Sequence, residues 1–120
     1  MKKLLPILIL LSAAPLLFAD TASVWATLDI QTDSMAQAVA DKNVSILQEL
    51  DHVISDEVAG LHRDPTLPPE VAPLLGEIAK QSTTTFHAGQ QNDWKLAAEN
   101  QTNFARAVKA AEAAAAPQKK

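Results

Sequence analysis

The residues best suited to chemistry in this chain lie in one stretch, QELDHVISDEVAGLHRDP, which runs from Gln48 to Pro65. On a helical wheel of 100° per residue, Glu49, His52 and Asp56 fall on one face, away from the apolar residues of the stretch. Spacings of three and four residues place side chains side by side on a helix, so the imidazole lies within reach of both carboxylates. One nitrogen and two oxygens could bind a divalent metal ion. The alternative is a solvated salt bridge, which contributes only about tenths of a kcal/mol to stability.

The number of available ligands favours the salt bridge over the metal site. A single helix face offers at most three ligands and no enclosing wall, whereas structural zinc sites usually close with four. The other two histidines are His62, at the start of a proline-containing linker, and His87, at the end of the next predicted helix. In an antiparallel helix pair these two residues would lie well over ~20 Å apart, because each residue adds about 1.5 Å. A divalent metal at Glu49, His52 and Asp56 is therefore the one cofactor site worth testing.

Signatures of catalysis are missing from the sequence. It contains no GxSxG, no HExxH and no glycine-rich phosphate loop. It also contains no cysteine, which excludes thiolate zinc sites, c-type haem attachment and thiol catalysis. Met35 lies on a core stripe, but the last predicted helix has no histidine to pair with it across a haem. The sequence therefore predicts a protein that is not an enzyme and has no organic cofactor.

Residues 1–19 have the pattern of a secretory signal peptide. Two lysines precede an apolar run that ends at Phe18, and Ala19 stands before a polar stretch. The run contains two prolines and is shorter than the roughly 20 residues that span a bilayer as a helix. Cleavage after Ala26 and an uncleaved anchor are the alternatives. We expect a periplasmic or secreted protein with no stable membrane span after cleavage.

The predicted mature chain, residues 20–120, is one small acidic domain. Removing the two lysines of the signal peptide changes the formal charge from −4 to −6. An acidic protein of this kind has no electrostatic reason to bind nucleic acid or an anionic membrane. The sequence does not specify an oligomeric state.

Scarce glycine, abundant alanine and apolar residues at spacings of three and four predict an all-α protein. Short links between helices of similar length favour an antiparallel up-down-up-down four-helix bundle over residues 20–116, followed by a disordered tail at 117–120. The four predicted helices cover about Thr21–Ala40, Val44–Leu61, Glu70–His87 and Asp93–Ala116.

The ends of these helices carry their own signals. Asn43 or Asp41 is the expected N-cap of the second helix and Asn92 that of the fourth, because their side-chain oxygens can accept from free backbone N–H groups. Gly89 is expected to end the third helix in the left-handed conformation. The run STTT at 82–85 is poor helix material and predicts fraying there.

The apolar stripes define a predicted core and its borders. Large aromatic side chains are readily buried, so they are expected inside the bundle; they are Trp25, Phe86, Trp94 and Phe104. Asp51 and Glu57 fall at the two borders of the second stripe, where they are expected either to extend their charged ends to solvent or to pair with neighbouring helices. Ile46 and Val53 lie at its flank, where they either remain exposed for a partner or contact a neighbouring helix.

Four segments carry a resemblance to a family: SVWATLD, LQELDHVISDEVAGL, LPPEVAPLLGEIAK and NFARAVKA. With the predicted signal peptide, they resemble small secreted helical proteins of Gram-negative bacteria, largely uncharacterised and often encoded beside heavy-metal efflux systems. The similarity covers most of the predicted mature chain. Family members read roughly HELAFAIRDLVAALP in the second helix; here Gln48 stands in place of the His and His52 in place of a Phe. The resemblance implies a periplasmic role near metal stress, but no metal role of that His carries over.

Two functional expectations follow. The first is an accessory or binding protein of the periplasm linked to metal homeostasis. The second is an interaction module that docks a helix face onto an envelope protein partner.

Overall fold

The computed structural model describes residues 21–116, which form four α-helices and contain no strand. They are α2 (Thr21–Ala40), α3 (Val44–His62), α4 (Val71–Gln90) and α5 (Trp94–Ala115). Each helix begins and ends within three residues of its predicted bounds. The predicted signal peptide, Asp20 and the tail at 117–120 lie outside the described residues.

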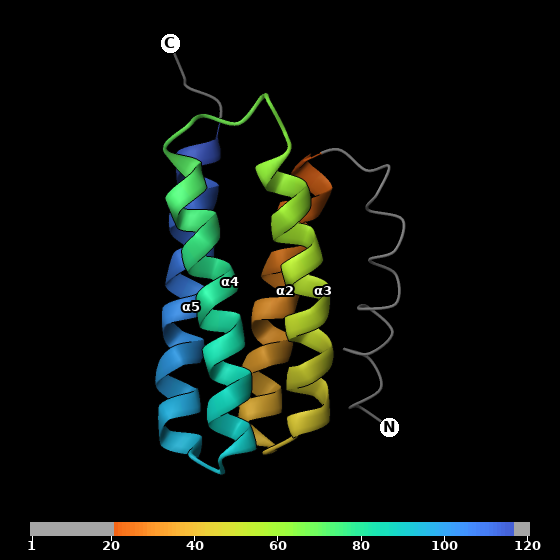
Figure 1. The fold of residues 1–120 in the computed structure, drawn as a ribbon, viewed down its shortest axis with the longest axis vertical. Helices are drawn as coiled ribbons and strands as arrows, with labels where there is room; N and C mark the ends of the chain where they lie inside the picture. Colours follow the sequence, from red (N-terminus) through yellow and green to blue (C-terminus); the bar gives the residue numbers. More distant parts are fainter. Residues whose placement is uncertain (1–20, 117–120) are drawn as a thin grey trace.

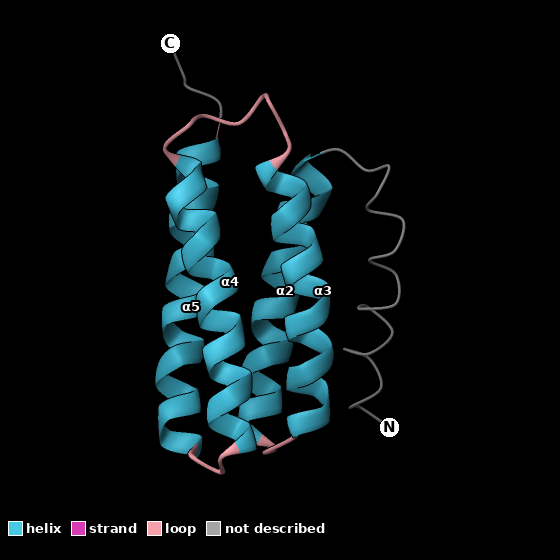
Figure 2. Ribbon diagram, in the orientation of Figure 1, coloured by secondary structure: helices cyan, strands magenta, loops and turns pink. Residues whose placement is uncertain are grey.

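The helices form the predicted antiparallel up-down-up-down bundle (Figure 1). The short α2–α3 and α4–α5 turns lie at one end, and the longer 63–70 loop crosses the other end (Figure 2). Helices that follow one another in sequence pack together, and α2 also packs against α5, so each helix contacts two neighbours. The most extensive interface joins α4 to α5, whereas the interfaces of α2 are smaller. No helix among residues 21–116 is long and apolar enough to cross a membrane.

The two short turns share one hydrogen-bond pattern. Lys42 and Asn92 adopt the left-handed conformation, with φ of 54° and 61°. The N–H of the next residue, Asn43 or Asp93, donates to a carbonyl five residues back at 2.8 Å in each turn, which is a Schellman end. The side chains of Asn43 and Asp93 then cap α3 and α5 by accepting from the N–H of the third residue on. Asn43 is confirmed as a cap, but the prediction of Asn92 is wrong because it occupies the left-handed position instead.

Gly89 does not end α4 as predicted. It has no positive φ, lies inside the helix and is buried. A Cβ placed there would lie 2.9 Å from the Trp94 ring and 3.0 Å from Leu47 Cδ1. The glycine is therefore needed for close packing of α4 against the start of α5, and Asn92 supplies the left-handed residue.

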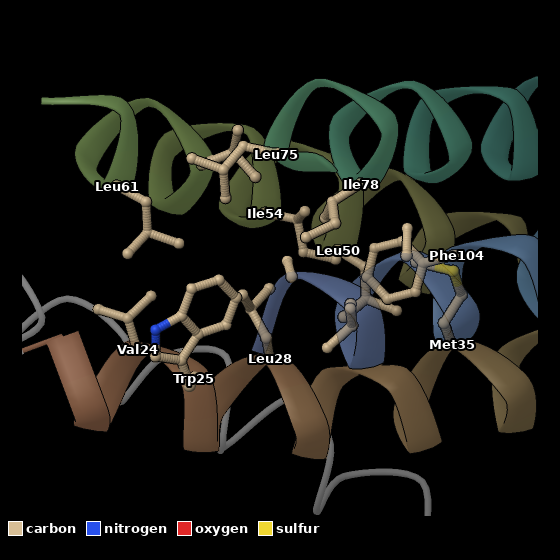
Figure 3. Close-up of a cluster of buried hydrophobic side chains, with 14 of the residues drawn as sticks. Val24, Trp25, Leu28, Met35, Leu50, Ile54, Leu61, Leu75, Ile78 and Phe104 are labelled. Atoms are coloured by element: carbon tan, nitrogen blue, oxygen red, sulfur yellow. The ribbon is translucent and has the colours of Figure 1, made fainter. Parts of the chain in front are cut away.

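The core runs the length of the bundle, with Met35 and Phe104 toward one end of the cluster and Val24, Trp25 and Leu61 toward the other (Figure 3). Two of the four predicted core aromatics, Trp25 and Phe104, are buried. Phe86 and Trp94 are partly buried and pack against the core.

The helix does not fray at 82–85. Ser82 and Thr85 are buried, and the Thr85 hydroxyl donates to the Gln81 carbonyl at 2.7 Å. Burial of short polar side chains whose hydroxyls are hydrogen-bonded outweighs the weak helix propensity of this run.

Ile46 and Val53 are contacts within the bundle and are not exposed. Ile46 is buried, and Val53 is half-buried against the core. The most exposed large apolar side chains within 21–116 are Ile30 and Leu96, each 41% exposed.

Candidate functional site

The predicted ligand face lies on the solvent side of α3, as expected from its spacing. Asn43 caps the helix, and the apolar residues from Leu47 to Leu61 are buried on its opposite side. His52 Nε2 lies 4.0 Å from Asp56 Oδ2, and both side chains are about four-fifths exposed, at 81% and 79%. At this exposure the contact is screened by water and contributes little to stability.

Glu49 is exposed on the same helix one turn before His52. Within residues 21–116, no group of three or more histidine, cysteine, aspartate or glutamate side chains is placed to hold a metal ion. The structure thus brings together His52 and Asp56, while their joint use with Glu49 stays a prediction. His62 ends α3 and His87 lies in the last turn of α4, at opposite ends of the bundle (Figure 1).

A second polar contact lies inside the bundle, between α2 and α3. Gln31 Nε2 donates to Glu57 Oε2 at 3.1 Å. Gln31 is fully buried and Glu57 is 8% exposed. Gln31 Oε1 and Glu57 Oε1 are both buried without a hydrogen-bond partner, which is costly for polar atoms removed from water.

The setting of Glu57 changes its acidity. Burial raises the pKa of Glu57 from its ordinary value of 4.5 to about 7; the hydrogen bond from Gln31 opposes this rise, and the charge of Asp56 adds to it. A carboxyl group removed from water prefers the neutral form, because ionisation then costs solvation energy. Glu57 therefore holds a proton over a pH range in which an exposed glutamate does not.

Glu57 lies at the border of the apolar stripe, as predicted, and of the two alternatives expected there the structure shows the contact to a neighbouring helix. Sequence reasoning missed Gln31. The spacing of residues in the sequence could have identified Gln31. Leu28, Gln31 and Met35 follow one another by three and four residues, so the Gln31 side chain interrupts an apolar stripe. A polar residue at such a position requires a buried partner.

Asp51, the other border residue, ties α3 to α4. Its Oδ1 accepts from Ser82 Oγ at 3.0 Å and from Thr83 Oγ1 at 2.8 Å. Between α2 and α5, burial and then the neighbouring Asp29 raise the pKa of Glu112. Both contacts join neighbouring helices.

Charge is distributed unevenly between the two helical hairpins. The α2–α3 hairpin, residues 21–62, contains a single lysine, Lys42, and seven acidic residues: Asp29, Asp33, Asp41, Glu49, Asp51, Asp56 and Glu57. The α4–α5 hairpin, residues 71–115, balances four acidic residues with four basic ones. The acidic character of the protein is thus concentrated on the hairpin that also carries His52.

Comparisons of the chain with protein-family models, with curated proteins and with solved structures find no match.

Proposed function

We propose that this is a small exported helical binding protein without enzymatic activity, an accessory protein of the periplasm linked to metal homeostasis. The observation that supports it best is the acidic α2–α3 hairpin, on whose exposed face His52 and Asp56 lie 4.0 Å apart. An imidazole beside a carboxylate attracts divalent cations, and the surrounding acids raise their local concentration. The export signal and the family resemblance supply the compartment and the link to metal stress.

Such a surface would hold a metal ion weakly. Two or three ligands on one exposed helix leave the remaining coordination positions to water, unlike a closed structural site. The protein would then act as a low-affinity acceptor of metal ions, or would contact a metal-handling partner through the same face.

The purified mature protein, residues 20–120, tests this proposal. We expect zinc or copper to raise its melting temperature relative to a chelator-treated sample, because binding to the folded state stabilises it. His52→Ala should abolish the shift. His62→Ala, which removes an exposed histidine from the end of the same helix, should preserve it. An unchanged melting temperature together with no bound metal in elemental analysis would rule out direct metal binding.

A second candidate function is docking onto an envelope protein. Ile30 and Leu96, on the neighbouring helices α2 and α5, are the most exposed large apolar side chains within the described part of the chain. Cross-linking in periplasm should then recover a partner with the wild type and less of it with Ile30→Ser. Ala26→Ser serves as the control, because it changes an exposed position on α2. Leu74→Ser does not, because Leu74 packs on the core. If cross-linking of the wild-type protein recovers no partner, the result would argue against docking.

A further inference from the structure

The turn between α2 and α3 is short and strained. It consists of residues 41–43, and its middle residue, Lys42, has a φ of 54°. A residue with a Cβ has a steric cost in this left-handed conformation, which glycine avoids. Short hinge loops under strain favour the exchange of an element between two copies of a chain, because the strain disappears when the loop opens. The α2–α3 turn therefore has the local properties of an exchange hinge.

The helix before this turn is the least extensively packed of the four. The interfaces of α2 with α3 and with α5 are both smaller than those that α4 makes with α3 and α5. The α2–α3 interface also buries Gln31 Oε1 and Glu57 Oε1 without hydrogen-bond partners. Unpaired polar atoms reduce the stability that an interface contributes. Helix α2 is thus the helix that leaves the bundle at the lowest cost.

A detached α2 would expose a large apolar surface. Its inner face buries Trp25, Leu28 and Met35, and separation would bring these side chains into water together with the surfaces of α3 and α5 that they cover. The hydrophobic effect strongly favours burying both surfaces again. An open α2 therefore needs a complementary surface to bind.

The surface that fits α2 is formed by α3 and α5. Besides the apolar contacts, Gln31 Nε2 donates to Glu57 Oε2 on α3 at 3.1 Å, and Gln101 Nε2 of α5 donates to the Thr32 carbonyl at 3.2 Å. A second copy of the chain offers the same acceptor and the same donor in the same positions. The α3–α5 surface of a second copy thus matches α2 as well as its own does.

We propose that α2 exchanges between two copies of this chain, with residues 41–43 as the hinge. In the exchanged dimer, α2 of each copy packs against α3 and α5 of the other. The contacts of α2 are retained, and Lys42 of both copies leaves the left-handed conformation. High protein concentration favours the dimer, because association is then less costly. The exchange goes beyond the proposed function and does not depend on a metal ion.

The other two connections are less suited to opening. At the α4–α5 turn the left-handed residue is Asn92, and asparagine tolerates this conformation better than lysine does. Trp94 Nε1 also donates to Asn92 Oδ1 at 2.7 Å, and the α4–α5 interface is the most extensive in the bundle. In the 63–70 loop no residue has a positive φ. Exchange is therefore confined to α2.

Refolding of the mature protein, residues 20–120, from urea tests whether the dimer forms. Size-exclusion chromatography with light scattering measures the mass of the product. Refolding at high protein concentration should give a dimer, whereas refolding after strong dilution should give the monomer. A protein that refolds only as a monomer at both concentrations would overturn the proposal.

Glycine at the hinge tests the source of the driving force. Lys42→Gly removes the strain from the closed turn of each copy, so it should raise the dissociation constant of the equilibrated dimer by about thirtyfold. Asn92→Gly makes the same change at the turn that stays closed and should leave the dissociation constant unchanged. No rise in Lys42→Gly, or an equal rise in both variants, would overturn the assignment of the hinge.

Cross-linking distinguishes exchange from a dimer of two intact bundles. The chain contains no cysteine, so Thr32→Cys combined with Gln101→Cys places one thiol on α2 and one on the part of α5 that it contacts. A short bismaleimide should join two chains in the refolded dimer, and the two thiols of one chain in the monomer, as resolved on a denaturing gel. A dimer in which the reagent joins thiols only within single chains would overturn the exchange.

Discussion

At the scale of single residues, the polar side chains that matter are the ones that cross between helices. Asp51 and Glu57 each accept hydrogen bonds from another helix, whereas His52 and Glu49 face solvent. The sequence predicted which acids lie at the border of the stripe, because that follows from 100° per residue. It could not predict their partners, because these depend on how the helices are aligned along the bundle axis.

Asp51→Ala is expected to destabilise the protein by about 1–3 kcal/mol. The substitution leaves the hydroxyls of Ser82 and Thr83 without their acceptor at a partly buried interface. Urea denaturation measures the effect. Glu49→Ala, on the exposed face of the same helix, should change stability by less than about 0.5 kcal/mol. Similar losses for the two variants would contradict the assigned role of Asp51.

Gly89→Ala and Gly76→Ala should have opposite effects. At Gly89 a new Cβ would meet the Trp94 ring at 2.9 Å and Leu47 at 3.0 Å, and crowding of this kind costs about 1–3 kcal/mol. At Gly76, also within α4, nothing lies within 4 Å of the new Cβ. Alanine there should stabilise the helix by roughly 0.5–1 kcal/mol. Melting temperatures compared with the wild type check both, and a stabilised Gly89→Ala would contradict the packing described.

Glu57 gives the stability of the protein an unusual pH dependence. The carboxyl group releases its proton near pH 4.5 in the unfolded chain and near pH 7 in the folded one, so between these values the folded state binds more protons. Its contribution to stability is therefore complete below about pH 4.5 and is lost as the pH rises to about 7, by on the order of 3 kcal/mol. Denaturation curves of wild type and Glu57→Gln across this range should diverge with rising pH, with the variant the more stable. A constant difference would contradict a raised pKa.

At the scale of elements, helix existence and approximate ends follow from apolar spacing, but the chemistry of the ends does not. Because glycine favours the left-handed conformation, Gly89 was the predicted end of α4. In the structure, Lys42 and Asn92 adopt that conformation instead. The reason is that Gly89 is required elsewhere, beneath the Trp94 ring. Similarly, the run at 82–85 stays helical in part because Asp51 on α3 accepts from the hydroxyls of Ser82 and Thr83. Helix propensity, which is a local property, does not contain that information.

The left-handed conformation of Lys42 at the α2–α3 turn can be tested by substitution. Lys42→Gly should raise stability by about 1 kcal/mol, because glycine adopts positive φ without a steric cost. Lys80→Gly, an exposed position inside α4, should lower it by a similar amount. Chemical denaturation of both variants distinguishes the two environments, and a destabilised Lys42→Gly would contradict the turn geometry.

At the scale of the whole molecule, the bundle is two helical hairpins of different charge packed together. The all-α architecture and its antiparallel order could be predicted from the sequence, because short links force neighbouring helices to run in opposite directions. The concentration of acidic residues on α2–α3 was also present in the sequence. Which of those acids face solvent depends on the packing, and the structure leaves Glu49 and Asp56 exposed beside His52 while it buries Glu57.

We propose that this protein functions through the exposed face of α3. Titration of the ¹⁵N-labelled mature protein with zinc, followed through its backbone amide signals, tests it most directly. We expect changes confined to α3 around Glu49, His52 and Asp56, and their loss in His52→Ala. Signals that do not move, or that move only at His62, His87 or the α4–α5 hairpin, would contradict it.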